Sequence, residues 1–305
     1  MANGTGAASS RQRIRSGGAD RAFSTIIYIF AALSLLVILY PLYFIIIASF
    51  SDPSAVSTGQ VWLKPAGFTL DGYTALIEHD KLWLGYRNTL VYTALGTAFG
   101  LFVNIAAAYP LSRKDLVFRT PLMILFVIPM FFSGGLIPTF LTVKEFGLYN
   151  NFWVMIIPFA VSSYNVIVAR TFFESNVPGD LWDAAQIDGC GNLRFFFVIV
   201  LPLSKAILSV LALWIAVGHW NSYFNSLIYL RDENLMPLQI VLRNILVTNQ
   251  MQSAMGTGEH VQIALRKAAL VRYSSIIVST IPIMCFYPFV QKYFNQGVMI
   301  GAVKG

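Results

Sequence analysis

The chain has 305 residues, of which 56% are hydrophobic and only 11% are charged, and its mean hydropathy is +0.65. Soluble domains usually carry about 25% charged residues, so this composition argues against an ordinary soluble protein and favours a membrane protein. The net charge of +7 does not indicate a nucleic acid partner, because the basic residues are dispersed at the ends of apolar runs. We expect the chain to contact the lipid bilayer and no nucleic acid.

Six apolar runs are long enough to cross a membrane, since a spanning helix needs roughly 20 apolar residues. None of the six contains Asp, Glu, Lys or Arg. They predict an all-α membrane protein with six transmembrane helices, and the first run is too long to be the apolar part of a cleaved secretory signal. In chain order the runs are residues 22–51, 88–112, 120–143, 146–169, 206–230 and 273–291.

Basic residues near the membrane ends predict which connections face the cytoplasm. The N-terminal tail is rich in arginine, and the second connection reads RKDLVFR at residues 113–119. Both are predicted to be cytoplasmic, and with six crossings both termini lie on that side. The predicted layout is a disordered cytoplasmic tail at 1–20, a first transmembrane helix at 21–51, an external cap at 52–87, a core of five transmembrane helices at 88–292 and a cytoplasmic tail at 293–305.

Two further features belong to the predicted outer side. The stretch SGGLIP, Ser133–Pro138, lies in the third run, where glycine and proline predict a kink or loop. The loop at 231–272 is external by the count of crossings, although it carries several basic residues, because longer loops follow the charge rule weakly. Its amphipathic part near Val261–Leu270 is expected to be either a docking surface for an external protein or a structural lid.

The longest predicted cytoplasmic connection, residues 173–203, contains DAAQIDGCGNLRFFFVIVLP. Pro178 suits a first helical turn, and Asp180 and Asp183 favour the positive end of a helix. Gly189 suits the left-handed residue that ends a helix. The pattern predicts a short helix of about three turns, followed by an apolar segment that is anchored at Pro202.

This stretch resembles the signature of the membrane permease subunits of type I ATP-binding-cassette importers, which is Glu-Ala-Ala, three residues, Gly, nine residues, Ile, one residue, Leu-Pro. Aspartate replaces glutamate as the only departure. The resemblance implies the permease fold of type I importers, with a cytoplasmic coupling helix that sits in a groove of the ATPase. The matching residues are Asp183, Ala184, Ala185, Gly189, Ile199, Leu201 and Pro202. Asp188 and Arg194 are expected either to pair with ATPase charges or to be solvated.

Other segments resemble the carbohydrate-importer branch, and more narrowly the permeases for complex oligosaccharides of the aldouronate type. They are GGLIP, VGHWNSYFNSLIYL, PLQIVLRNILV and GVMIGAVKG. The resemblance implies a second homologous permease, two ATPase subunits, an extracytoplasmic solute-binding protein and a carbohydrate substrate, in a bacterial cytoplasmic (inner) membrane. The chain has no GxxxxGK[ST] phosphate loop, so we expect no enzyme activity and no cofactor here, with ATP and Mg bound by the ATPase.

Polar and aromatic residues inside two runs are candidates for the translocation path. Amides in a span are costly unless they face a partner or water, and aromatic faces commonly hold sugars. The alternative is that these side chains bond to neighbouring helices and never meet the substrate. The candidates are Tyr164 and Asn165 in the fourth run and Trp220, Asn221, Tyr223 and Asn225 in the fifth. No metal site is expected, because His219 and His260 lie apart from any acidic or cysteine cluster.

The rival hypothesis is an ion-coupled secondary transporter. Such proteins usually place ionisable residues inside their spans as relays. The six uncharged runs argue against it. A channel is disfavoured because no recognisable filter sequence occurs.

Overall fold

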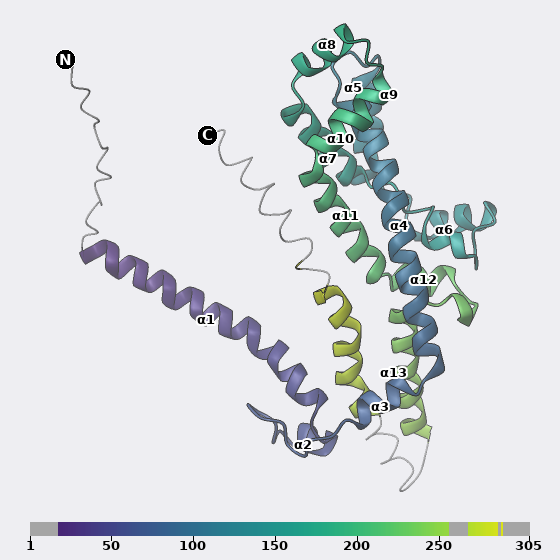
Figure 1. The fold of residues 1–305 in the computed structure, drawn as a ribbon. Helices are drawn as coiled ribbons and strands as arrows, with labels where there is room; N and C mark the ends of the chain where they lie inside the picture. Colours follow the sequence, from purple (N-terminus) through teal and green to yellow (C-terminus); the bar gives the residue numbers. More distant parts are fainter. Residues whose placement is uncertain (1–17, 256–267, 286–287, 289–305) are drawn as a thin grey trace. The chain divides into compact units, whose positions relative to one another are not determined.

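The computed structural model describes residues 18–255, 268–285 and 288, and over this part of the chain it is all-helical (Figure 1). The labelled helices are α1 (Gly18–Ser49), α2 (Pro53–Ser57), α3 (Asp71–Ile77), α4 (Asp80–Ser112), α5 (Arg119–Phe131), α6 (Leu136–Glu145), α7 (Ser163–Asn176), α8 (Gly179–Ile187), α9 (Asn192–Phe195), α10 (Leu201–Leu203), α11 (Lys205–Trp220), α12 (Phe224–Tyr229) and α13 (Leu238–Met255). A last helix spans Ala268–Cys285. Single 3-10 turns, η1 and η3, lie at Phe152–Met155 and Glu233–Leu235, and the π-helical turn η2 lies at Phe196–Val200.

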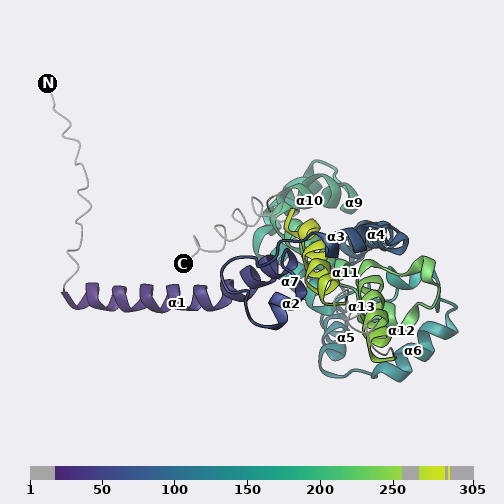
Figure 2. The same ribbon diagram turned by 90° about the horizontal axis from the view of Figure 1, so that it is seen from below.

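α4 is the central helix of the larger unit, residues 69–305. It packs against α7, α11 and α13, and α4, α11 and α13 lie side by side when seen from below (Figure 2). Gly96 makes room for a side chain of α11, because a Cβ there would lie 2.3 Å from Nε2 of His219. Small residues also let helix backbones come together, as at Gly85, where a Cβ would lie 3.1 Å from the Cα of Leu238 on α13.

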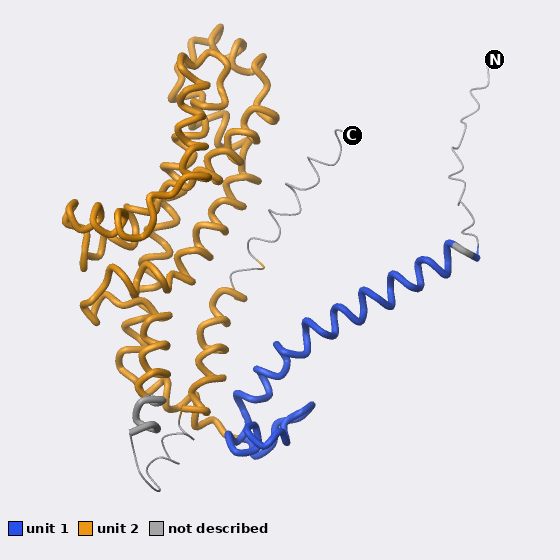
Figure 3. The backbone as a smooth tube through the Cα atoms, turned by 180° about the vertical axis from the view of Figure 1, so that it is seen from behind, with its two compact units in different colours: residues 1–68 blue, residues 69–305 orange. Residues whose placement is uncertain are grey.

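The smaller unit, residues 1–68, consists of α1, α2 and the loop after them (Figure 3). α1 has 32 residues and is apolar, and nearly all of its large side chains are exposed. Its C-terminal part packs within the unit, where Ile47 and Phe44 contact a small cluster with Ala55 and Val61. The Tyr43 hydroxyl also donates to the Leu63 carbonyl at 2.6 Å. An exposed apolar helix of this length is typical of a membrane span that faces lipid.

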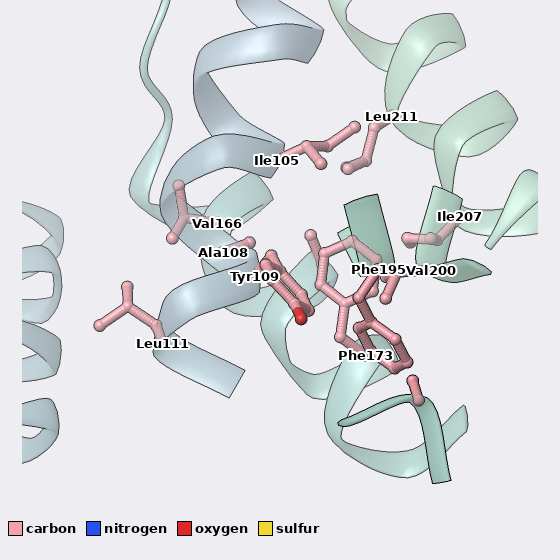
Figure 4. Packing of buried hydrophobic residues seen from close by; sticks show 12 residues of the cluster. Ile105, Ala108, Tyr109, Leu111, Val166, Phe173, Phe195, Val200, Ile207 and Leu211 are labelled. Atoms are coloured by element: carbon pink, nitrogen blue, oxygen red, sulfur yellow. The ribbon is translucent and has the colours of Figure 1, made fainter. Parts of the chain in front are cut away.

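One buried cluster gathers the ends of several helices of the larger unit. It joins the C-terminal part of α4 to α7, α8, α9 and α11. Tyr109, Phe173 and Phe195 point toward one another in its centre (Figure 4), and the rings of Tyr109 and Phe173 meet edge to face at 6.1 Å. α8 and α9 therefore rest on the same core as the central helix.

Three described helices are long and apolar enough to cross a membrane by themselves, at Asp20–Ser49, Asp80–Ser112 and Ala268–Cys285. Two bent pairs raise the number to five among the described residues. α5 and α6 bend by 118° and the Asn192–Leu203 segment meets α11 at 82°. The predicted break at Ser133–Pro138 is confirmed. It is sharper than a kink, with Gly135 in a left-handed conformation at φ 84°.

The fourth predicted run, 146–169, is not a continuous helix, so the prediction is wrong there. Residues 146–162 form turns and the short 3-10 segment η1, and α7 begins only at Ser163 and continues to Asn176. At the end of this stretch, the buried side chain of Asn104 on α4 donates to the Ala160 carbonyl at 2.7 Å and accepts from the Ser162 amide at 2.9 Å. These bonds satisfy two backbone groups of the non-helical segment just before α7.

The fifth run is also interrupted. α11 ends at Trp220, and α12 begins only at Phe224. Residues 221–223 are therefore not helical, although the sequence predicts a continuous helix there. Several predictions lie outside the described residues: the tail up to residue 17, the loop part at 256–267 and the C-terminal tail at 293–305.

Candidate functional site

α8 is the short helix that the sequence predicts in the long connection. It has nine residues, with Asp180 in the first turn, and Gly189 takes the predicted left-handed conformation at φ 72°. Pro178 differs from the prediction, because it precedes the helix as the N-cap residue instead of lying in the first turn. Proline holds the residue before it in an extended conformation, so Val177, with ψ at 92°, separates α7 from α8.

The predicted coupling residues lie on two faces of the connection. Asp183, Ala184, Asp188 and Gly189 are exposed on and after α8, whereas Ala185 is buried. The outer face also carries an apolar side chain, because Ile187 is 87% exposed. This face offers carboxylates and an exposed apolar tip together.

The other predicted coupling residues follow α8. Arg194 is exposed on α9, Pro202 is exposed in α10, and Leu201 packs against the buried cluster. The structure therefore places Ala185 and Leu201 inward and the charged residues outward.

The inner face of α8 is fixed by an aromatic and a cation. The ring of Trp182 meets Phe195 of α9 edge to face at 5.0 Å, and the guanidinium carbon of Arg113 lies 4.1 Å from the centre of the Trp182 ring. Arg113 is the residue that follows α4. It donates from Nε and Nη2 to the two carboxylate oxygens of Asp115, at 2.8 and 2.7 Å.

The ion pair shifts the acidity of its carboxylate. The hydrogen bonds from Arg113 lower the pKa of Asp115 below its ordinary value, and the same bond raises the pKa of Arg113. The side chain of Asp115 is 66% exposed and that of Arg113 only 16%. The cation is thus held between the indole and a carboxylate that solvent reaches.

A second anchor joins the end of α4 to α5 and α7. Arg119 and Arg170 both donate from Nε to the Leu111 carbonyl, at 2.9 and 3.2 Å. Both also pair with the carboxylate of Glu174, at 2.5 and 2.9 Å. Cations are favoured at the C-terminal end of a helix, where the carbonyls are unpaired. These bonds fix the end of α4 to α5 and to α7, the helix that precedes α8.

The candidate path residues divide into two groups. Asn165 and Asn225 line one cavity of about 250 Å³, together with Ser162, His219 and Ser222. Trp220 is buried and donates from Nε1 to the Ser279 carbonyl at 3.0 Å, and Asn221 donates to Val217 of its own helix at 3.0 Å. Tyr164 is exposed against Trp214, with ring centres 5.6 Å apart, and Tyr223 is exposed.

Sequence reasoning missed the polar residues that hold the non-helical segments. Asn104 fixes the stretch before α7. Asn88 donates to the carbonyls of Asn234 and Met236 at 2.7 and 3.1 Å, in the segment that precedes α13. The available signal was an amide inside an apolar run, which needs a buried partner. No signal in the sequence pointed to the contact between Arg113 and Trp182.

Comparison with known proteins identifies the family. The chain is 40% identical to the polygalacturonan/rhamnogalacturonan transport system permease protein YtcP of Bacillus subtilis, over 94% of this chain and 99% of that protein. It is 36% identical to Protein LplC of the same organism, over 87% and 89%. A crystal structure of a bacterial ABC transporter involved in the import of the acidic polysaccharide alginate matches with a TM-score of 0.82 and 31% identity, covering 92% of this chain and 99% of that one. Residues 96–300 match the family model described as binding-protein-dependent transport system inner membrane component, and the chain belongs to this family.

Proposed function

We propose that this chain is a permease subunit of an ATP-driven importer for acidic oligosaccharides, with α8 as its coupling helix. One observation carries the proposal: at the position of the family signature, α8 has one face packed on the core and one face exposed. Its inner face is fixed by Trp182 and Ala185 to the core that includes the end of α4. Its outer face leaves Asp183, Ile187 and Asp188 exposed, which suits a protein partner.

The proposed complex contains a second homologous permease, two ATPase subunits and an extracytoplasmic solute-binding protein. ATP and Mg²⁺ are bound by the ATPase, so this chain supplies no catalytic group. The ATPase must bind α8 with different affinity in its open and closed states, because a partner without such a preference shifts no conformational equilibrium. The path then alternates between the two sides of the membrane.

The proposed membrane layout keeps six crossings with both termini in the cytoplasm of the bacterial cell. Three single helices and two bent pairs account for up to five spans, and the turns of residues 146–162 with α7 supply the sixth. Non-helical backbone at membrane depth is tolerated where protein covers it. The bonds of Asn104 to Ala160 and Ser162 supply such cover. The proposed layout retains the external cap at 52–87 and the external loop at 231–272.

The substrate class follows from the named relatives and the cavity. YtcP is named for polygalacturonan and rhamnogalacturonan and the matching crystal structure for alginate, which are polymers that contain uronic acids. In the cavity, Asn165 and Asn225 with Ser162 and Ser222 offer amide and hydroxyl groups. These groups suit sugar hydroxyls, and we assign the cavity to the translocation path.

Uptake by proteoliposomes tests the proposal. The chain is reconstituted with the second permease, the ATPase and a binding protein, and oligogalacturonides, alginate oligomers and neutral maltodextrins are compared. We expect uptake of the acidic oligomers with ATP inside and none of the neutral ones. Uptake driven by a proton or sodium gradient without ATP would instead support the secondary transporter, and ATP-driven uptake of neutral sugars alone would refute the substrate class.

A further inference from the structure

Arg113 lies at the junction between α4 and the loop at residues 113–119, which is cytoplasmic in the proposed layout. It is the C-cap residue of α4, with extended backbone at φ −78° and ψ 137°, so its side chain leaves the helix end. Besides the two bonds to Asp115, its Nη1 donates to the hydroxyl of Tyr109 at 3.3 Å. The guanidinium is oriented by these bonds before it meets Trp182.

Trp182 is the large side chain on the inner face of α8. It immediately precedes Asp183, which faces outward, and its indole lies between Arg113 at 4.1 Å and Phe195 at 5.0 Å. A nine-residue helix is marginally stable by itself, so side-chain contacts set its position. The other inward residue of α8, Ala185, offers only a methyl group for this purpose.

α4 links the contact between Arg113 and Trp182 to the cavity assigned to the sugar path. Two turns and a half before Arg113 on the same helix, the amide of Asn104 bonds to Ala160 and Ser162. Both of those residues line the cavity that contains Asn165 and Asn225. A contiguous chain of packed and hydrogen-bonded groups therefore connects the inner face of α8 to the cavity wall, which is the kind of network that carries energetic coupling.

We propose that Arg113 and Trp182 form a positioning pair through which a movement of α8 is passed to α4 and from there to the cavity. This inference rests on the proposed function, in which the ATPase binds the outer face of α8. In this role, neither residue needs to contact the substrate or ATP. The planar guanidinium is required, because it covers the indole face while its edge binds Asp115, and a lysine ammonium cannot do both.

A double-mutant cycle in the reconstituted complex tests the pair. The variants are Arg113→Ala, Trp182→Leu and their combination, and the readout is the number of sugar molecules imported per ATP hydrolysed. We expect each single variant to lower this ratio about 5- to 20-fold, within the usual range of coupling effects, and the double variant to be no worse than either. Arg113→Lys is expected to fall between Arg113→Ala and the unmodified protein.

Lys114→Ala is the matched control, because Lys114 is the exposed cation next to Arg113 in the same loop. It should leave the ratio unchanged. The amount of assembled complex is measured for every variant by size-exclusion chromatography, so that a folding defect is seen separately. The unmodified complex must show ATP-driven uptake first; if it does not, the proposed function fails and not merely the pair.

Two results would overturn the inference in a complex that works. One is full coupling in either single variant, or losses that multiply in the double variant, since independent residues behave in that way. The other is a variant that assembles poorly but imports the normal number of sugars per ATP in the assembled fraction, which would make the contact purely structural.

Discussion

Asn104 is a buried amide that satisfies backbone groups of a non-helical segment. It is completely buried in α4, and its amide satisfies the carbonyls of Gly100 and Ala160 and the N–H of Ser162. A buried backbone group left without a partner costs about 1–3 kcal/mol. The turns before α7 are stable because these groups are satisfied.

Asn104→Leu is expected to lower the free energy of unfolding by about 2–4 kcal/mol, because Ala160 and Ser162 each lose a partner. Thermal unfolding of the purified protein in detergent measures the loss. Asn221→Leu is the control, since among the described residues that exposed amide bonds only to Val217 of its own helix, and its effect should stay within about 0.5 kcal/mol. Equal losses in both variants would contradict the role of Asn104.

The Arg113–Asp115 pair predicts a pH dependence. The pKa of Asp115 is lowered in the folded protein, so the pair stabilises fully above the ordinary aspartate pKa, and this stabilisation is lost as the pH falls through the lowered value. The exposed carboxylate limits the effect to less than about 1 kcal/mol. The stability difference between the unmodified protein and Asp115→Asn should be constant from about pH 8 to about pH 5 and should shrink only in stronger acid. A difference that vanishes near neutral pH would refute this assignment.

At the scale of an element, the end of α8 depends on Gly189. Its φ of 72° is strained for any residue with a Cβ, although a Cβ there would meet no atom within 4 Å. Gly189→Ala is expected to cost about 1–2 kcal/mol and to reduce sugar-stimulated ATP hydrolysis. The matched control is Gly179→Ala at the other end of α8, where the space is also open and no positive φ is required. The prediction fails if the two variants hydrolyse ATP alike.

The contact of α4 with α11 depends on Gly96. A methyl group there would overlap the imidazole of His219, and overpacking of this kind typically costs about 1–3 kcal/mol. Gly96→Ala should therefore lower the thermal unfolding temperature, and adding His219→Ala should restore most of it. Gly218→Ala, where no atom lies within 4 Å, should have little effect. Absence of rescue in the double variant would contradict a direct clash.

The same elements show what the sequence could predict. The break at Gly135 and the end of α8 at Gly189 both follow from the local conformational preference of glycine, so both can be predicted from the sequence. The signature at 183–202 locates α8, but its contact with Arg113 joins residues about 70 positions apart and depends on the fold. Hydropathy similarly marked residues 146–169 as a span, because an apolar composition does not reveal that residues 146–162 are non-helical or that Asn104 bonds to Ala160 and Ser162.

The candidate path shows the same limit. The sequence predicted six path residues, of which the structure brings Asn165 and Asn225 to one cavity. Trp220 instead bonds to Ser279 on the last described helix, which is the alternative that the sequence left open. Which polar residues share a cavity depends on how α7 and α11 pack on α4, and a single run carries no information about its neighbours.

At the scale of the larger unit, the structure separates the parts that meet different partners. α8 and α9 lie at one end of the unit, and α3 and α13 lie at the other (Figure 1). The cavity with Asn165 and Asn225 is bordered by α11 and the segment before α7, between these ends. This arrangement suits a permease that meets its ATPase at one end and its binding protein at the other.

Site-specific cross-linking to the ATPase tests the central claim, that α8 is the coupling helix, most directly. Gln186 is exposed on the outer face of α8 and is replaced by cysteine in a protein without Cys190 and Cys285. We predict that a reagent joining the thiol introduced at position 186 to a lysine amine gives a cross-linked product of this chain with the ATPase, whose yield changes when ATP is bound. Leu125→Cys, exposed on α5 within a candidate span, should give none. No product from position 186, or equal products from both positions, would contradict the account.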